Sequence, residues 1–405
     1  MSFQQGLSGL NAAAKNLDAI GNNVANANTV GFKQSQAQFA DVYANSLNGG
    51  GGSQVGIGVK VAQVAQQFTQ GNITATNNAL DIAINGGGFF RMETNGEATY
   101  QRNGQFQLDR QGFIVNPTGA KLTGYQANAS GVLLTGAATP LSINTADLVP
   151  QFTTKVNAVI NLDSRNAVPA VAPFNMNDPL SFNNSTAVSV FDSLGNSHTL
   201  QTFYVKTGPN AWEVHASMDG DPAFTPVPTN TLNFDPSGAL AAGSTMTIPP
   251  QTLTTGANPL GFPIDFIGTS QFGSSFSVNT LNQDGYTSGR LGGFNIGADG
   301  IIVGRYTNGQ SAVLGQVVLA NFSNPNGLQQ LGNNQWAETS TSGTPLVGSP
   351  SSGSLGVLQS SAVEDSNVDL TAELVNMITA QRVYQANAQT IKAQDAVLQT
   401  LVNLR

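Results

Sequence analysis

The sequence predicts an α+β protein, mostly β, with one helix at each terminus and two β-rich regions between the helices. Three observations favour this fold class. Apolar residues recur in steps of three and four at both ends of the chain, and they alternate with polar residues in between. Proline content and charge also change sharply in the middle third. A chain of 405 residues is long enough to fold as two or three domains.

The first helix is predicted over residues 1–28, where the apolar positions follow a heptad pattern. These positions are Phe3, Leu7, Leu10, Ala14, Leu17, Gly21 and Val24. The pattern ends at 28–31, where β-branched residues and glycine disfavour a helix. Lys15 and Asp18 are the two charges in the first 32 residues, and an isolated helix of this kind is marginal in water. We therefore expect this helix to become ordered on self-assembly; an antiparallel helix pair within one ordinary monomer is the alternative.

The second helix is predicted over residues 366–405. The same heptad rhythm continues there through Leu370, Leu374, Met377, Gln381, Tyr384, Ala388, Ile391, Asp395, Leu398 and Val402. The segment SNVD at 366–369 has the form of a capping box, which predicts a helix start at Ser366.

Between the helices the period changes to two. Residues 81–85 and 105–109 alternate apolar and polar side chains, which predicts half-buried strands. Asn95-Gly96 is typical of a tight hairpin turn. The glycines at 86–88 follow a strand, but the residues after them are strand-like, so a hairpin turn is favoured over a phosphate cradle. The connector at 34–71 shows no clear pattern.

A separate acidic domain is predicted in the middle of the chain. Thirteen of the 18 prolines lie between Pro150 and Pro263, and residues 147–284 carry −7 of the net charge of −8. Strands at 187–191 and 198–205 flank a turn at 194–196. The predicted domains are 1–28 with 366–405 (terminal helices), 29–71 with 356–365 (connector), 72–146 with 285–355 (middle β domain) and 147–284 (inserted outer β domain).

The motif search predicts that the chain is no enzyme and binds no metal or cofactor. There are no cysteines, and no nucleophile-elbow, zinc-helix, Walker-loop or EF-hand motif occurs. Of the two histidines, His215 falls on the polar face of a predicted strand, which indicates an exposed or structural histidine. A spatial pair of carboxylates cannot be seen in a sequence. A carbohydrate-binding or carbohydrate-hydrolysing β protein is therefore the alternative from another functional class.

Composition also bears on partners. A pI near 4.6 argues against nucleic acid and anionic membrane surfaces. No apolar run approaches 18 residues, and the first residues lack the pattern of a secretory signal, so we expect neither membrane insertion nor a cleaved signal peptide.

Four segments resemble one known family. The segment NNVANANTVGFK at 22–33 resembles the signature of bacterial flagellar axial proteins of the rod and hook. Its signature residues are Asn22, Asn23, Ala25, Asn26, Thr29, Gly31, Phe32 and Lys33. Residues 368–388 look like the matching C-terminal signature, and 80–90 and 100–106 are similar to the family's β core. The inserted region 147–284, followed by 314–322 and 332–338, favours the hook branch over the shorter rod proteins, although a distal-rod protein remains an alternative.

The resemblance implies a structural subunit that self-assembles into the curved tubular joint transmitting torque from rod to filament. The terminal helices would pair as a coiled-coil inner domain, with the two β domains nested between them. Implied assembly residues are Phe3, Leu7, Leu10, Leu17, Val24, Leu370, Leu374, Met377, Tyr384, Ile391, Leu398 and Val402. Implied partners are further copies of the chain, the rod, the hook cap, the hook–filament junction, the hook-length-control proteins and the flagellar type III export apparatus. The implied location is the extracellular flagellum.

Overall fold

The computed structural model describes residues 2–42, 56–128, 130–220 and 229–403. The chain forms two compact units. The first contains residues 1–144, 293–304 and 311–405, and the second contains residues 145–292 and 305–310. The finer division into four domains stays a prediction, whereas a mostly β fold with a helix near each end is confirmed.

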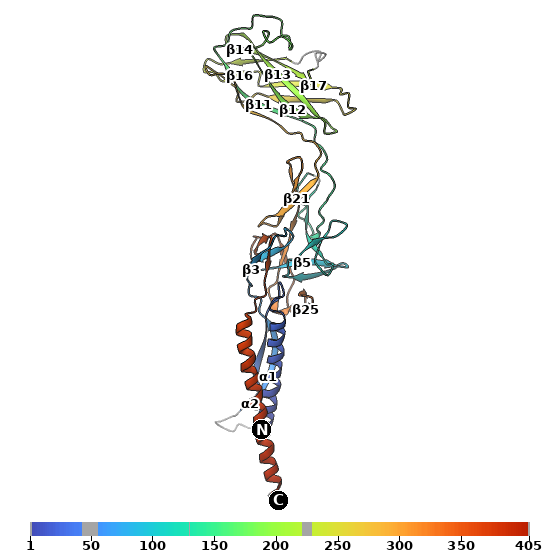
Figure 1. The fold of residues 1–405 in the computed structure, drawn as a ribbon, viewed down its shortest axis with the longest axis vertical. Coiled ribbons are helices and arrows are strands. Elements are labelled where there is room, and N and C mark those ends of the chain that lie inside the picture. The colour runs from blue at the N-terminus through green and yellow to red at the C-terminus, as the bar shows by residue number, and fades with distance from the viewer. Residues whose placement is uncertain (1, 43–55, 129, 221–228, 404–405) are drawn as a thin grey trace. The chain divides into compact units, whose positions relative to one another are not determined.

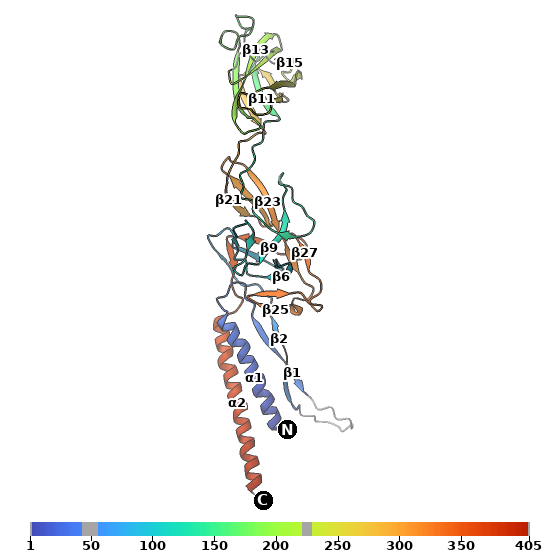
Figure 2. The same ribbon diagram turned by 90° about the vertical axis from the view of Figure 1, so that its right-hand side faces the viewer.

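In the first unit, helices α1 (Ser2–Ala25) and α2 (Leu370–Asn403) lie side by side and antiparallel (Figures 1 and 2). The predicted start of the second helix at Ser366 is wrong. Asp369 is the capping residue, because its Oδ1 accepts hydrogen bonds from the amides of Thr371 (2.9 Å) and Ala372 (3.1 Å). The Ser366 hydroxyl instead accepts the amide of Val368 at 3.3 Å, ahead of the helix.

A two-stranded hairpin follows α1 in the sequence. Strands β1 (Ser35–Val42) and β2 (Gly58–Gln66) pair antiparallel and pack along α1 (Figure 2). This hairpin occupies the connector at 34–71 that showed no pattern, because its side chains are mostly small or amide-bearing and do not alternate clearly between apolar and polar.

The β core of the first unit is one large sheet. Within the described ranges, thirteen strands join it, with the main path β21-β22-β23-β9-β5-β6-β26-β25. The strands are β5 (Phe89–Thr94), β6 (Glu97–Gln101), β7 (Gln107–Leu108), β8 (Ile114–Val115), β9 (Lys121–Gln126), β10 (Thr139–Pro140), β21 (Leu291–Ile296), β22 (Ile301–Tyr306), β23 (Ser311–Val317), β24 (Leu319–Asn321), β25 (Gln329–Gly332), β26 (Gln335–Ala337) and β27 (Leu346–Gly348). A short 3₁₀ turn spans Pro325–Gly327. The Asn95-Gly96 turn between β5 and β6 is confirmed, with φ of 53° and 88°.

Aromatic side chains form part of this core. Tyr100 and Phe322 meet edge to face with ring centroids 4.8 Å apart, and Phe89 contacts Trp336 at 5.6 Å. Such edge-to-face pairs add to the free energy gained from burying the rings.

Two further strand pairs join distant parts of the chain. Strand β28 (Val357–Ser360) pairs with β4 (Ile82–Asn85), and β29 (Ala362–Glu364) pairs with β3 (Ile73–Ala75). The strand predicted at 81–85 is present as β4, but it is not half-buried, because Ile82, Ala83 and Ile84 are all fully buried. Both faces of β4 are therefore covered.

Two other local predictions also differ from the structure. The glycines at 86–88 do not close a hairpin, since β4 pairs with β28 while β5 pairs with β6, β9 and β24. In the segment 105–109, the strand is limited to β7, and Gln105 bridges to Asp81.

The second unit contains two sheets of five strands each, counted over its described residues. One has the order β17-β18-β11-β19 with β20 also on β11, and the other has the order β12-β13-β14-β15-β16. Their bounds are β11 (Val156–Asp163), β12 (Asn184–Phe191), β13 (Ser197–Gly208), β14 (Ala211–Met218), β15 (Thr229–Phe234), β16 (Leu240–Ala242), β17 (Thr245–Gln251), β18 (Leu260–Asp265), β19 (Ser270–Phe272) and β20 (Ser277–Gln283). Apolar side chains from both sheets form one core around Trp212.

The predicted turn at 194–196 connects β12 to β13 and is confirmed. Gly195 has a φ of 85°, a conformation that glycine adopts without a steric penalty. His215 on β14 is a structural histidine, since it is buried with its ring stacked on Phe174 at 4.0 Å.

Candidate functional site

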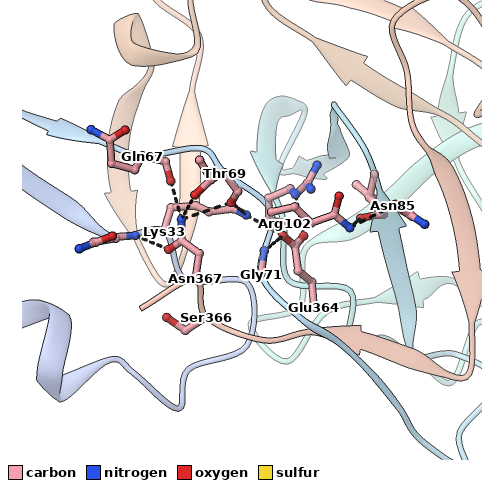
Figure 3. A network of polar contacts seen from close by, with 12 residues as sticks. Lys33, Gln67, Thr69, Gly71, Asn85, Arg102, Glu364, Ser366 and Asn367 are labelled. Atoms are coloured by element: carbon pink, nitrogen blue, oxygen red, sulfur yellow. Dashed lines mark hydrogen bonds and ion pairs between the residues drawn. The ribbon is translucent and has the colours of Figure 1, made fainter. Parts of the chain in front are cut away.

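The chemistry-bearing feature of the first unit is the junction where residues 31–34 meet residues 364–373 (Figure 3). In the described part of the chain, no group of three or more His, Asp or Glu side chains is arranged to hold a metal ion. The junction instead holds a buried ion triad and a set of side-chain amides that bind backbone groups. Its geometry therefore indicates a structural role.

The ion triad consists of Lys33, Arg102 and Glu364. Lys33 Nζ lies 2.6 Å from Glu364 Oε1, and Arg102 Nε lies 2.8 Å from Glu364 Oε2. Lys33 and Glu364 are 1% and 0% exposed, so water solvates neither charge. One carboxylate thus holds two cations that come from segments far apart in the sequence.

Backbone groups complete the bonding of the triad. Lys33 Nζ also donates to the Thr69 carbonyl at 2.7 Å, and the Gly71 amide donates to Glu364 Oε1 at 3.0 Å. The Arg102 guanidinium donates to the carbonyls of Gly86 and Gly88. Buried charges are tolerated when their remaining hydrogen-bonding capacity is used in this way. The glycines at 86–88 therefore direct backbone carbonyl oxygens at Arg102 and form no phosphate cradle.

The electrostatics of the triad follow from its burial and charge. Burial and the neighbouring Arg102 guanidinium lower the pKa of Lys33, although Glu364 opposes both effects. Burial disfavours the charge of Glu364, but Arg102 and Lys33 outweigh it and hold the pKa of its carboxyl below the usual range. Glu364 is therefore ionised at neutral pH, as a bridge between two cations requires.

Side-chain amides extend the junction from the triad to α2. The Asn367 side chain donates to the backbone carbonyl of Gln67 at 2.8 Å (Figure 3). It also accepts a hydrogen bond from the backbone amide of Gln34 at 2.7 Å. Gln34 Nε2 donates to Glu373 Oε1 in the first turns of α2 at 2.5 Å. The segment before α2 is thus bound to the residue that precedes β1 and to the residue that follows β2.

The signature residues near Lys33 shape the turn that leads into the junction. Asn23 exchanges two hydrogen bonds with the backbone of Ser35, each 2.8 Å long, so the end of α1 is bound to the start of β1. Gly31 has a φ of 72°, and its amide donates to the Glu364 carbonyl at 2.7 Å. A Cβ added at Gly31 would lie 2.5 Å from the Asn103 nitrogen, so a side chain has no room there.

The other signature residues support the same turn or face solvent. Asn26 accepts the Thr29 hydroxyl at 3.2 Å and donates to the Asn22 carbonyl at 3.0 Å. Phe32 is buried, whereas Asn22 and Ala25 are exposed.

The contact between the two helices differs from the predicted heptad seam. A Cβ added at Gly6 would lie 3.1 Å from Ile391, and one at Gly9 would lie 2.7 Å from the Asn387 side chain. Small residues thus bring α1 close to α2, and the buried side chains of α1 include Ala12, Ala13, Ala19 and Ile20.

The large residues of the predicted seam lie mostly outside this contact. Leu10, Leu17, Val24, Met377 and Ile391 are half-buried, whereas Phe3, Leu7, Leu370, Leu374, Tyr384 and Leu398 are exposed. The side chain of Val402 falls outside the described residues. The role of this set in assembly stays a prediction, and so does the dependence of helix order on assembly.

Sequence reasoning missed Arg102 and Glu364. Both are single charged residues between strand-like segments, and nothing local indicates their burial. The scarcity of charge was a usable signal, since only 9% of residues are charged. A buried cation such as Lys33 needs an anionic partner, and the sequence offers few acidic residues to choose from.

Family models of flagellar proteins match four segments of the chain. A family model described as flagella basal body rod protein matches residues 3–33, and one described as flagellar basal body rod FlgEFG protein C-terminal matches 359–404. The flagellar hook protein FlgE/F/G D1 domain matches 83–159, and the flagellar basal body protein FlaE D2 domain matches 161–286.

Curated relatives match over the full chain. The flagellar hook protein FlgE of Salmonella typhimurium is 46% identical over 411 residues, covering 100% of both chains. The chain belongs to the flagellar hook protein family. The hook proteins FlgE of Escherichia coli and Borreliella burgdorferi are 44% and 33% identical, and each alignment covers 100% of this chain and at least 99% of the relative.

A solved structure supports the hook-family fold. The crystal structure of Helicobacter pylori flagellar hook protein FlgE2 matches with a TM-score of 0.56 at 15% identity, covering 72% of this chain and 100% of that chain. The resemblance deduced from the signatures at both ends is therefore confirmed. Neither described α-helix of this hook-family chain is long and apolar enough to cross a membrane.

Proposed function

We propose that this chain is the structural subunit of the flagellar hook and polymerises into its tubular joint. Full-length identity of 46% to a flagellar hook protein carries the proposal, together with the family models that match both ends and the inserted region. The role is mechanical and not enzymatic. The proposed location is the flagellum outside the cell, reached through the flagellar export apparatus without a cleaved signal peptide.

The geometry supports a subunit that is completed by neighbours. Both terminal helices keep large apolar residues exposed in one chain, including Phe3, Leu7, Leu374 and Leu398. Exposed apolar side chains that repeat along helices are typical of interaction surfaces. In the proposed tube, α1 and α2 form the coiled-coil inner domain, and their exposed residues pack against further copies.

The junction supports the mechanical role. Force that passes along the chain between the helices and the β sheet of the first unit must pass through residues 31–34 and 364–369. The ion triad and the Asn367 contacts tie these two connections to each other and to residues 67–71, which follow β2. Two linked connections resist bending and twisting better than one free strand.

The remaining proposed partners are the rod, the hook cap, the hook–filament junction and the hook-length-control proteins. A distal-rod subunit is the second candidate, because two matched family models are described as basal body rod proteins. The match of the D2 domain model to 161–286 and the full-length identity to hook proteins favour the hook.

Two experiments test the function. Purified full-length chain, concentrated or salted out, is expected to form tubes visible by electron microscopy, whereas chains lacking residues 1–28 or 376–405 should stay folded and monomeric. Deletion of the gene in its host should give cells that build rods but neither hook nor filament. Tubes from either truncated chain would refute the role of the helices, and a normal hook in the deletion strain would refute the function.

A further inference from the structure

The first unit contains an open cavity of about 610 Å³ between α1, α2 and the β1–β2 hairpin. We call it the α1–α2 groove and define it by Gly9, Ala13, Ile20, Glu373, Thr379 and Ala380. Most of these side chains are small, so the groove is wide enough to receive large side chains from elsewhere. No residue of the ion triad lines this groove.

The Glu373 carboxylate in the groove lacks one hydrogen-bond partner among the described residues. The residue is 3% exposed, and its Oε1 accepts a hydrogen bond from Gln34 Nε2. Its Oε2 is buried and has no hydrogen-bond partner among the described residues. Leaving a buried carboxylate oxygen unpaired is costly, so a donor that enters the groove and binds this oxygen would remove the cost. A cationic donor would supply this hydrogen bond and also balance the charge of the carboxylate.

Helix α2 itself carries a matching feature. Leu374, Ile378 and Arg382 are spaced four residues apart, so they form one ridge along the helix. Leu374 and Ile378 are 45% and 52% exposed, and Arg382 is also exposed. In the described part of the chain, Arg382 takes part in no ion pair within 4.0 Å. The ridge therefore presents two unpartnered apolar side chains followed by an unpaired cation.

The groove and the ridge face different directions. At about 100° of rotation per residue, the α2 residues that line the groove and the ridge residues lie about 160° apart around the helix axis. The ridge of a chain therefore cannot fill the groove of the same chain. It is available to another copy.

We propose that the α1–α2 groove of one copy receives the Leu374, Ile378 and Arg382 ridge of a second copy, with Arg382 pairing with Glu373. The inference rests on the proposed function, since it names a contact within the polymer. Because groove and ridge lie on opposite faces of one helix, the contact joins two different patches. Contacts of this kind join copies head to tail, which gives rings or open helical filaments and no two-fold dimer.

The other cations of the helices fit the groove less well. Lys15 is already paired with Asp18 at 3.1 Å on the surface of α1. Lys392 follows Arg382 by ten residues, which is about 15 Å along the helix. The residue four positions before it is the half-buried Ala388, so Lys392 does not end an exposed apolar ridge. Lys392 therefore serves as a matched control.

Charge exchange tests the pair in the full chain. Arg382→Glu is expected to raise the protein concentration needed for tube assembly about tenfold or more, and Glu373→Arg should do the same. The double variant Glu373→Arg/Arg382→Glu should assemble near the wild-type concentration, whereas Glu373→Arg/Lys392→Glu should not. Because Arg382 is exposed, Arg382→Glu should keep the circular dichroism spectrum of the monomer.

Disulfide crosslinking tests the contact independently of charge, and the absence of native cysteines makes it clean. An Ile378→Cys chain and a Thr379→Cys chain are mixed, assembled and oxidised. We expect mixed disulfide dimers in tubes and few from the Ile378→Cys chain alone. Wild-type tubes with no mixed dimers, or wild-type assembly by Arg382→Glu, would overturn this inference alone. A wild-type chain that forms no tubes would overturn the proposed function as well.

Discussion

Lys33 Nζ and Glu364 Oε1 lie 2.6 Å apart in the interior, although the two residues are 331 positions apart in the sequence. Arg102 holds the second oxygen of the same carboxylate. The pair is therefore part of a buried network in which Glu364 is the shared anion. Its removal should have a larger effect than the removal of either cation.

Glu364→Gln should lower the free energy of unfolding of the first unit by about 3–5 kcal/mol, because it leaves two buried cations without a counter-ion. Lys33→Met should cost less, since the Arg102–Glu364 pair remains. Urea unfolding followed by circular dichroism measures both. Lys15→Met, which breaks an exposed pair, is the control and should have little effect. A Glu364→Gln protein as stable as Lys15→Met would contradict the network.

Alanine substitution should change the stability of the first unit in opposite directions at Gly21 and Gly31. Gly31→Ala should destabilise by about 1–3 kcal/mol, because φ is positive and the new Cβ would lie against Asn103. Gly21→Ala should stabilise by about 0.5–1 kcal/mol, because Gly21 lies inside α1 with open space around it. Thermal unfolding of both variants measures the two changes in stability. Equal changes would show that the backbone conformation at Gly31 is unimportant.

His198 should stabilise the second unit at acidic pH. Its Nδ1 lies 2.6 Å from Asp219 and its Nε2 lies 3.3 Å from Asp192. Burial opposes its charge, but Asp219 and Asp192 outweigh burial and raise the pKa of His198.

The raised pKa of His198 determines how its contribution to stability changes with pH. A raised pKa contributes stability that is complete below the unfolded-state pKa of about 6.5 and is lost as pH rises through the folded-state pKa. The melting temperature of His198→Gln should therefore fall furthest below wild type near pH 6 and approach it near pH 9. A difference that does not change with pH would mean that the imidazolium charge contributes nothing.

His215 should have the opposite dependence. Burial lowers its pKa although Glu213 opposes the shift, and both ring nitrogens lack hydrogen-bond partners among the described residues. The stability contributed by the neutral ring is complete above about pH 6.5 and is lost as pH falls through the folded-state pKa. His215→Phe can keep the stack on Phe174, so it should reduce the acid sensitivity of the second unit. Calorimetric scans from neutral to acidic pH measure the effect, and an unchanged acid transition would exclude His215 as its source.

Sequence patterns predicted the elements whose signals are local. The two helices follow from periodicity, and the turns at Asn95-Gly96 and Gly195 follow from residues that adopt positive φ. The signatures at both ends indicated the family, because each is a contiguous run of residues that can be recognised without knowledge of its contacts.

What sequence patterns could not predict depends on contacts between distant segments. The heptad marked large residues as the seam, but the contact between the helices is made where Gly6 and Gly9 allow close approach. The capping box placed the helix start at Ser366, because the competing cap at Asp369 lies only three residues later. Of the ion triad, Lys33 and Arg102 lay in segments that resemble the family, but nothing local indicated that both bind Glu364.

The pairing of β28 with β4 and of β29 with β3 also sets an order of events during synthesis. A ribosome makes residues 73–85 long before residues 357–364, so β3 and β4 have no strand partner until β28 and β29 have been made. Until then, the backbone groups of β4 that pair with β28 have no partner there, and Lys33 and Arg102 lack the carboxylate of Glu364. Completion of the first unit therefore depends on residues 357–364, however early its other strands are made.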